Sequence, residues 1–231
     1  MKYDKVIRGK FISRPNRFIA LVDVDGCIET VHVKNTGRCK ELLIPGCKVY
    51  LSISNNPNRK TKFDLVATKK DIGQGRYILI NMDSQIPNDV AEEWLRSGEL
   101  FSKSATIRRE VTFGDSRIDF YIEDGARKAF LEVKGCTLEK GGIAMFPDAP
   151  TERGVKHIKE LTKCVKDGYE AYILFVIQMK GVREFRPNDE TDEKFGEAIR
   201  EASKNGVKLI AMDSIVTPES LLIDSKIKIT L

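Results

Sequence analysis

Short apolar stretches, rich in β-branched and aromatic residues, alternate with turn-forming residues over about the first 80 positions of the chain. None of these stretches has the spacing of apolar residues that marks an amphipathic helix, so this segment is expected to be all-β. Asp25-Gly26 lies between two of them and suits the left-handed backbone angles of a tight hairpin turn. The expected strands are residues 6–12, 18–24, 28–33, 48–54, 62–68 and 76–81.

The pattern changes after Asp83, where helical and strand-like stretches begin to alternate. Residues 151–166 carry a single apolar stripe, which predicts an amphipathic helix, and residues 171–177 are a continuous apolar run, as expected of a strand buried on both faces. The other expected elements are helices at 88–96 and 191–204 and strands at 107–113, 117–123, 126–134 and 207–211. This order predicts two domains, an all-β barrel over residues 1–83 and an α/β domain with a mixed sheet over residues 84–231.

Charge is distributed unequally between these two segments. Residues 1–83 carry 16 Lys and Arg against 8 Asp and Glu, a net charge of +8, whereas the remainder has a net charge of −3. Clustered basic residues favour a polyanionic partner, because the neutralisation of phosphates releases bound counterions. A small basic barrel of about five strands fits the OB-fold, which binds oligonucleotides. A lysine-rich surface without such a partner is the alternative.

Apolar runs and cysteines bear on the cellular location. No apolar run approaches the roughly 20 residues that a membrane-spanning helix needs, and the first residues do not form a signal peptide. The 5 cysteines are scattered, without the C-x-x-C pairs of zinc sites and redox motifs, and are expected to be reduced and mostly buried. The protein is therefore expected to be soluble and cytoplasmic.

Two acidic residues and a lysine are expected to meet on one face of a predicted hairpin. With Asp124-Gly125 as its two-residue loop, Asp119 lies diagonally from Glu132, at roughly 7 Å between backbones. Lys134 follows Glu132 on the same side of the strand, because side chains alternate between the faces of a sheet. The opposite face of the hairpin is then apolar, as a core requires.

This cluster has the composition of a metal-dependent hydrolytic site. Two carboxylates at that separation can share Mg²⁺ or Mn²⁺, which prefer oxygen ligands and keep positions open for water and a phosphate oxygen. Lys134 can position or deprotonate the attacking water, while the metal neutralises charge that grows in the transition state. Asp119, Glu132 and Lys134 are thus the candidate catalytic residues for phosphodiester hydrolysis. The alternative is that Glu132 and Lys134 only cover a solvated sheet face.

A second candidate site lies where a glycine-containing loop leads into the helix predicted at the middle of the second segment. Thr151 is a suitable N-cap, and the free N–H groups of a helix N-terminus can hold a phosphate together with Arg153. His157 lies one turn further along the same face. An ordinary exposed cap is the alternative. Glu110 and Glu152 are further acidic candidates, with simple surface charges as the alternative.

Aromatic and basic residues are interleaved in the N-terminal segment, an arrangement that suits contacts with single-stranded nucleic acid. The aromatic residues are Phe11, Phe18, Tyr50, Phe63 and Tyr77, most of which are instead expected in the barrel core. The loop at residues 32–38 is polar, basic and contains glycine, so it is expected to be a contact loop. The candidates for phosphate or DNA contact outside the helix N-terminus are Arg14, Arg17, Asn35, Arg38, Lys60 and Arg117.

Five separate motifs occur in order along nearly the whole chain. They are Asn35-Thr36-Gly37, Ser116-Arg117-Ile118-Asp119-Phe120, Glu132-Val133-Lys134, Phe146-Pro147-Asp148-Ala149, and Thr151-Glu152-Arg153-Gly154 with His157. Their order and spacing resemble the sugar fermentation stimulation protein A family. The resemblance implies an N-terminal OB-fold, a C-terminal domain of the PD-(D/E)xK restriction-endonuclease-like class, and DNA binding with little sequence preference. It also implies a divalent metal at Asp119, Glu132 and Val133, with Lys134 completing the nuclease motif.

Two positions depart from the pattern of that family. Lys34 stands where proline is frequent, and adds a charge to the predicted contact loop. Gly135-Cys136 follow the lysine where Asn or Ser and then Val are frequent. Neither departure removes an expected metal ligand.

Three functions are compatible with the sequence. The first is a metal-dependent DNA nuclease. The second is a non-catalytic DNA-binding transcriptional regulator, because the family name refers to a phenotype and its members are usually described as regulators. The third, a carbohydrate or metabolite binder, has little support, since Trp94 is the one tryptophan and lies in a predicted helix. The expected partner is DNA, single-stranded DNA included, and the sequence leaves the oligomeric state open, a homodimer included.

Overall fold

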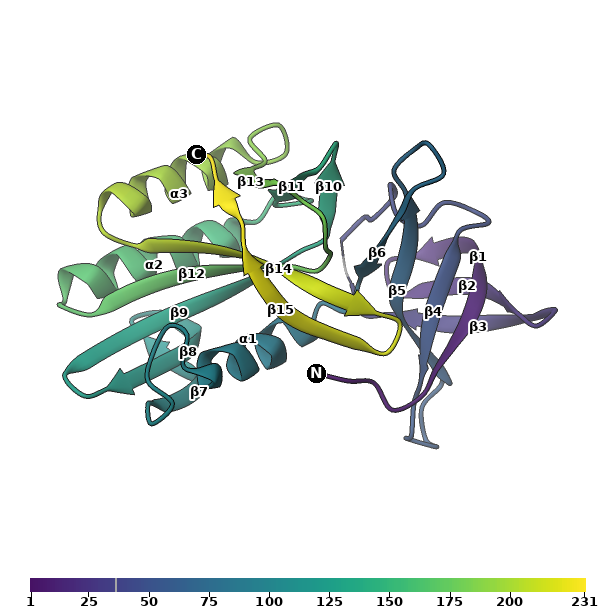
Figure 1. The fold of residues 1–231 in the computed structure, drawn as a ribbon, viewed down its shortest axis with the longest axis horizontal. Helices are drawn as coiled ribbons and strands as arrows, with labels where there is room; N and C mark the ends of the chain where they lie inside the picture. The colour runs from purple at the N-terminus through teal and green to yellow at the C-terminus, as the bar shows by residue number, and fades with distance from the viewer. Residues whose placement is uncertain (36) are drawn as a thin grey trace.

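The N-terminal segment forms a small β-barrel, seen at the right of Figure 1. The computed structural model describes residues 1–35 and 37–231, and its first six strands coincide closely with the six predicted ones. They are β1 (Val6–Asn16), β2 (Ile19–Val24), β3 (Cys27–Val33), β4 (Lys48–Ile53), β5 (Phe63–Asp71) and β6 (Tyr77–Asn81). The strand order is β3-β2-β1-β4-β5-β6, and a parallel pairing of β3 with β5 closes the barrel, as expected of an OB-fold.

Local sequence signals explain the barrel well. Asp25 and Gly26 take φ angles of 51° and 85°, which confirms the predicted tight turn between β2 and β3. Inward-facing residues such as Val22, Val31 and Leu65 are fully buried. Their alternation with exposed residues is the period-two pattern that predicted the strands.

The second domain is built on a mixed sheet, as predicted, but the sheet has six strands where the sequence predicted five, because its edge strand β15 was not predicted. Its elements are α1 (Ile86–Ser97), β7 (Thr106–Phe113), β8 (Ser116–Asp124), β9 (Arg127–Cys136), α2 (Glu152–Lys166), β12 (Glu170–Ile177), α3 (Glu193–Lys204), β14 (Lys208–Thr217) and β15 (Ser220–Lys226). The order is β15-β14-β12-β9-β8-β7, in which β12 runs parallel to both β9 and β14. Helices α2 and α3 cover one face and α1 covers the other (Figure 1).

Strand β12 illustrates how the two faces are filled. Ile173 and Phe175 pack in the core under α2 and α3, whereas Tyr172 and Leu174 pack with α1. The run is buried throughout, which confirms the prediction of a strand covered on both faces.

A third, small sheet escapes sequence prediction. It contains β10 (Leu138–Lys140), β11 (Ile143–Phe146), β13 (Glu184–Pro187) and β16 (Lys228–Ile229). These strands have between 2 and 4 residues, which is too short for an alternating pattern to be recognised.

The predicted register of the β8–β9 hairpin is wrong by two residues. Asp124 pairs with Arg127, so the loop is Gly125-Ala126 and not Asp124-Gly125. Gly125 has φ 61°, and a hairpin turn with glycine at its first central position needs no second left-handed residue. Phe120 consequently pairs with Leu131, the last pair of the ladder, which brings Asp119 closer to Glu132 than the predicted diagonal.

The two domains meet in a buried polar junction. The amide nitrogen of Gln178 donates to the carbonyl oxygens of Asn81 and Asp83, at 3.2 and 3.0 Å. Asp83 also accepts a hydrogen bond of 2.9 Å from Lys34 in the barrel, and Tyr3 lies against the same carboxylate. Asn81, Asp83 and Gln178 are each at most 1% exposed, so these bonds replace hydration that folding removes.

Membrane insertion through a helix finds no support in the described residues. Within residues 1–35 and 37–231, no helix combines the length and the apolar character that crossing a bilayer requires.

Gln178→Leu tests the importance of the junction. The substitution keeps an apolar stem of similar size but removes the donor, so two buried carbonyl groups lose their partner. We expect the free energy of unfolding, measured by urea denaturation, to fall by roughly 2–4 kcal/mol. Gln85→Leu, at an exposed position just before α1, should change it by less than about 0.5 kcal/mol. Equal stability of the two variants would show that the Gln178 hydrogen bonds do not stabilise the junction.

Candidate functional site

Glu132 occupies the centre of β9 with its side chain buried on the α2 side of the sheet. It is 3% exposed, and its Oε1 accepts hydrogen bonds from Lys134 Nζ at 2.6 Å and from His157 Nδ1 at 2.5 Å. Its Oε2 is equally buried but has no partner in the part of the chain that the structure describes. A buried carboxylate oxygen without a donor is costly, and it is an acceptor that a cation could use.

Asp119 approaches the same place from β8, just beyond the end of the β8–β9 ladder. Its Oδ2 accepts from the backbone N–H of Val133 at 2.8 Å, and its Oδ1 accepts from Asn88 Nδ2 at 3.0 Å. Burial, together with the nearby Glu132 carboxylate, raises the pKa of Asp119 to about 6. For Glu132, burial alone would raise the pKa, but hydrogen bonds from His157 and Lys134 outweigh burial and lower it.

The structure therefore brings Asp119, Glu132 and Lys134 together. The two carboxylates, with Glu132 Oε2 unpartnered, form an oxygen-rich site that suits a hard divalent cation. No group of three or more His, Cys, Asp or Glu side chains suited to a metal occurs within residues 1–35 and 37–231. Any further ligands would be backbone oxygens, water or substrate, as is usual for Mg²⁺.

Two residues of this site were not assigned their role from the sequence. Asn88, in the first turn of α1, orients the Asp119 carboxylate, and nothing in its sequence context indicates this. His157 was expected to hold phosphate, yet it is 6% exposed and its ring lies between Glu132 and Arg153. The Arg153 Nε lies 3.4 Å from His157 Nε2, which confirms that the two residues share one helix face. Within this site, then, His157 orients Glu132.

The N-terminus of α2 is capped as predicted. Thr151 Oγ1 accepts from the Gly154 N–H at 3.0 Å, and the Thr151 N–H donates to Asp192 Oδ2 at 2.8 Å. Thr151 is thus engaged within the protein, whereas Arg153 and Glu152 are exposed. Of the residues expected to hold phosphate here, Arg153 is exposed, Thr151 is half-buried and His157 is buried.

Glu110 and Arg117 pair with each other, although the β7–β8 register places Glu110 beside Asp119, between the pairs Arg109–Phe120 and Val111–Ile118. They form an exposed ion pair of 2.5 Å between the neighbouring strands β7 and β8. Glu110 has a φ of 58°, an uncommon backbone conformation outside glycine.

Two of the basic residues expected to contact DNA turn inward. Arg14 donates to the backbone carbonyls of Arg17, Asn35, Gly37 and Arg38 at 2.6–2.9 Å, so its guanidinium group holds the loop after β3 together. Lys34, expected to add charge to that loop, instead pairs with Asp83 at 2.9 Å and with Asp64 at 3.7 Å.

The loop itself is partly described. Asn35 is buried, and its Oδ1 accepts from the Gly37 N–H at 2.8 Å. Thr36, part of the first motif, lies outside the described residues. A Cβ on Gly37 would lie 2.0 Å from Asp148 Oδ2, so the first and fourth motifs pack directly against each other.

Exposed basic residues lie on three loops of the barrel, and an exposed aromatic residue accompanies one of them. Arg17, Arg38 and Lys60 are exposed, and Phe18 is 45% exposed with the Arg17 guanidinium 5.1 Å from its ring centre. Of the five aromatic residues, three are core residues, as expected of most of them: Phe11, Tyr50 and Phe63. Tyr77, like Phe18, is exposed.

Comparison with known proteins finds a match for the N-terminal barrel and another for the α/β segment that follows it. A family model described as the SfsA N-terminal OB domain matches residues 12–80, and one described as the sugar fermentation stimulation protein RE domain matches residues 85–220. The chain belongs to the sugar fermentation stimulation protein family. This confirms the resemblance seen in the five motifs.

Individual relatives are similar over their whole length. The sugar fermentation stimulation protein homolog of Clostridium beijerinckii is 51% identical over 231 residues, with both chains fully covered. The homolog of Desulfitobacterium hafniense, strain DCB-2, is 54% identical over 96% of this chain and 94% of its own. Pyrococcus furiosus SfsA, solved in complex with Ca²⁺, is 30% identical with a TM-score of 0.85 over 100% of this chain and 98% of that one.

Asp119→Asn tests the electrostatics of the carboxylate pair. The folded protein holds a proton on Asp119 up to about pH 6, whereas the unfolded chain releases it near pH 4. The aspartate therefore destabilises the fold increasingly as pH rises between these values. In metal-free buffer at about pH 7.5, Asp119→Asn should raise the free energy of unfolding by roughly 1–3 kcal/mol. The gain should vanish below about pH 4, where the aspartate is protonated in both states.

The substitution is structurally mild. An asparagine can accept from Val133 and, once the Asn88 amide turns over, donate to Asn88. Asp115→Asn, at an exposed position in the turn before β8, is the matched control and should leave the pH profile unchanged. If the free energy of unfolding of Asp119→Asn changed with pH in parallel with that of the wild type, the raised pKa of Asp119 would be refuted.

Proposed function

We propose that this protein is a DNA-binding protein with little sequence preference that hydrolyses phosphodiester bonds at a divalent-metal site of the PD-(D/E)xK type. The observation that carries the proposal is the buried carboxylate pair, in which Glu132 Oε2 has no partner within the described chain and Asp119 has a raised pKa. Such a pair has fewer hydrogen-bond donors around it than its oxygens can accept, and a bound cation would stabilise its negative charge.

The residues present fit Mg²⁺ or Mn²⁺. Asp119, Glu132 and the backbone carbonyl of Val133 would hold the cation, which would supply a nucleophilic water at neutral pH and offset negative charge on the reacting phosphate. The relative from Pyrococcus furiosus binds Ca²⁺, another hard cation that takes oxygen ligands.

Lys134 and His157 position the reacting groups. His157 Nδ1 donates a hydrogen bond to Glu132 Oε1, which orients the carboxylate and leaves Oε2 without a partner among the described residues. Lys134 Nζ is held at 2.6 Å from the same Oε1, and the Lys134 side chain is 14% exposed. From there its ammonium group can bind a phosphate oxygen or orient the attacking water.

The barrel supplies the nucleic-acid surface in this proposal. The loop between β1 and β2, which holds Arg17 and Phe18, and the loop between β4 and β5, which holds Lys60, are the loops with which OB-folds bind oligonucleotides. An exposed ring beside basic side chains suits stacking on single-stranded bases. Because all 5 cysteines are free, the protein suits the reducing cytoplasm, where DNA is present.

A non-catalytic DNA-binding regulator is the second candidate. It is favoured by the small number of side-chain ligands, because the described residues offer two carboxylates and no third acidic, histidine or cysteine ligand. In that case the basic barrel would bind DNA and the carboxylate pair would be a structural remnant.

DNA cleavage separates these candidates. With Mg²⁺ or Mn²⁺ the wild-type protein should nick or degrade DNA, and Asp119→Asn, Glu132→Gln and Lys134→Met should each lower the rate by roughly 10³-fold or more. DNA affinity should stay within about threefold of wild type. Asp115→Asn serves as the control that keeps full activity. Wild-type protein that cleaves no single-stranded, duplex or branched DNA would leave the regulator as the function.

DNA binding through the barrel loops is tested separately. Phe18→Ala should weaken binding of a single-stranded oligonucleotide about tenfold, because one stacked base is lost. Arg17→Ala and Lys60→Ala should each reduce the slope of log affinity against log salt by about 1. Lys204→Ala, on α3, should bind like wild type. Fluorescence anisotropy at several salt concentrations measures the affinity of all four variants. Unchanged binding by the three loop variants would show that DNA binds to another surface of the protein.

A further inference from the structure

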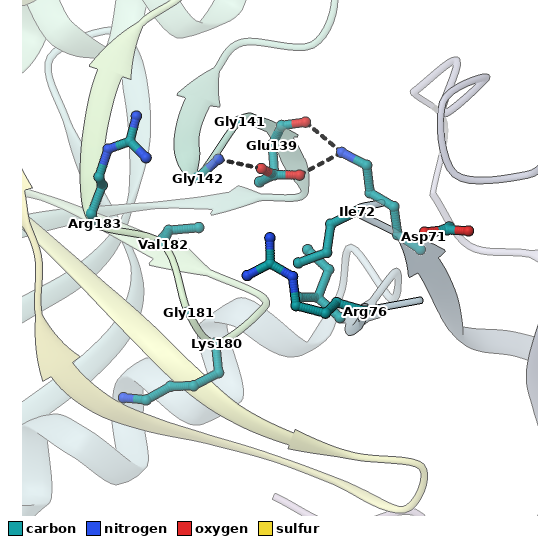
Figure 2. A pocket seen from close by; sticks show the side chains of 12 residues that line it. Asp71, Ile72, Arg76, Glu139, Gly141, Gly142, Lys180, Gly181, Val182 and Arg183 are labelled. Carbon is teal, nitrogen blue, oxygen red and sulfur yellow. Dashed lines mark hydrogen bonds and ion pairs between the residues drawn. The ribbon is translucent and has the colours of Figure 1, made fainter. Parts of the chain in front are cut away.

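A cleft of about 500 Å³ separates the β5–β6 hairpin of the barrel from the second domain (Figure 2). Its walls are the hairpin, the turn between β10 and β11, and the segment that follows β12. The volume is that of a site for a small organic molecule. The charged residues around it are Lys70, Asp71, Arg76, Glu139, Lys180 and Arg183.

Two of the four basic side chains are already neutralised. Lys70 Nζ donates to the carbonyl oxygen and to Oε2 of Glu139, at 2.5 and 2.6 Å. Lys180 pairs with Asp213 at 2.8 Å and also contacts Asp224. These pairs fix the walls of the cleft but leave no positive charge of their own for a ligand.

Arg76 and Arg183 are different, because neither guanidinium group has a hydrogen bond or ion pair with residues 1–35 or 37–231. Figure 2 shows Arg76 reaching from the hairpin into the cleft, while Arg183 rises from the far wall. The Arg183 guanidinium lies beside Gly142, where an added Cβ would approach Nη1 to 3.0 Å. One unpaired arginine thus comes from each domain.

Hydrogen bonds of the buried Glu139 carboxylate hold the walls of the cleft in place. Glu139 is 4% exposed, and its Oε1 accepts from the Gly142 N–H at 2.5 Å, which holds the β10–β11 turn in shape. The same carboxylate binds Lys70 across the domain boundary, so an ion pair joins the two walls of the cleft. Ile72, Ile78 and Val182 add an apolar surface between the charged groups.

The cleft is separate from the loops assigned to DNA. Strand β5 has 9 residues and runs from the β4–β5 loop, at one end of the barrel, to the β5–β6 hairpin at the other. At the rise of an extended strand these ends are roughly 25–30 Å apart. The charges of Arg76 and Arg183 therefore do not belong to the proposed contact loops.

We propose that this cleft binds a small organic phosphate, whose phosphate groups are held between Arg76 and Arg183 and whose organic part lies on Ile72, Ile78 and Val182. Guanidinium groups bind phosphate oxygens through paired N–H donors, which favours arginine at phosphate sites. A ligand held by one arginine from each domain also joins the domains. The proposal is independent of catalysis at Asp119 and Glu132.

Calorimetric titration with adenosine diphosphate and with inorganic pyrophosphate tests the proposal. Both carry the same diphosphate unit, and EDTA removes any contribution of a metal. We expect adenosine diphosphate to bind with a Kd below about 1 mM and at least about threefold more tightly than pyrophosphate. Arg76→Gln and Arg183→Gln should each weaken binding about tenfold, and the double variant should abolish it. Arg8→Gln, at an exposed arginine of β1, is the matched control and should bind like wild type.

A second measurement distinguishes a small ligand from nucleic acid. The double variant should bind a single-stranded oligonucleotide as tightly as wild type does. If neither phosphate compound binds, or if the double variant binds both as wild type does, the cleft is not this site. Loss of oligonucleotide binding in the double variant would make the cleft part of the DNA surface and overturn the proposal. Equal affinity for adenosine diphosphate and pyrophosphate would show that the site does not recognise an organic part, and would also overturn it.

Discussion

The carboxylate of Glu132, buried within an otherwise apolar strand, constrains the elements around it. Desolvation of a charge costs several kcal/mol unless hydrogen bonds compensate, and Glu132 is flanked by the buried residues Leu131 and Val133. Compensation comes from Lys134 on the same strand and from His157 on α2. The rotation of α2 over the sheet is therefore set by a polar contact as well as by its apolar stripe. The remaining oxygen, Oε2, makes the site an acceptor for a cation.

A series of hydrogen bonds and ion pairs connects this site to the barrel. Asp64 binds Arg59, in the loop between β4 and β5, and also Lys34, which in turn binds Asp83. Asp83 accepts from the backbone N–H of Gln85 just before α1, the helix whose Asn88 orients Asp119. A proposed DNA-contact loop and the carboxylate pair are thus held in a fixed relation by buried polar groups, which are geometrically more demanding than apolar contacts.

The elements were largely predictable, and the errors are local. All six barrel strands and the three helices follow from periodicity, because burial of one face imposes it. The β8–β9 register was wrong because Asp124-Gly125 is a good turn pair, yet Gly125 alone provides the left-handed position. The strands of the small sheet were too short to recognise, and the edge strand β15 of the main sheet was not predicted. The candidate triad was found from strand alternation even though the register was shifted, since a shift of two residues keeps every side chain on its face.

By itself, the sequence determined which segments are strands and helices, which faces are buried, and that Asp119, Glu132 and Lys134 share one side of a hairpin. Only the tertiary structure decided the partners of the polar groups. His157 lies 25 residues from Glu132, and Lys34 lies 49 residues from Asp83. Periodicity arises from neighbours along the chain, whereas a buried polar group takes its partner from whichever distant segment packing brings within hydrogen-bond distance. For that reason Arg14 and Lys34, basic residues of a predicted contact surface, turn inward, while Arg76 and Arg183 face an open cleft.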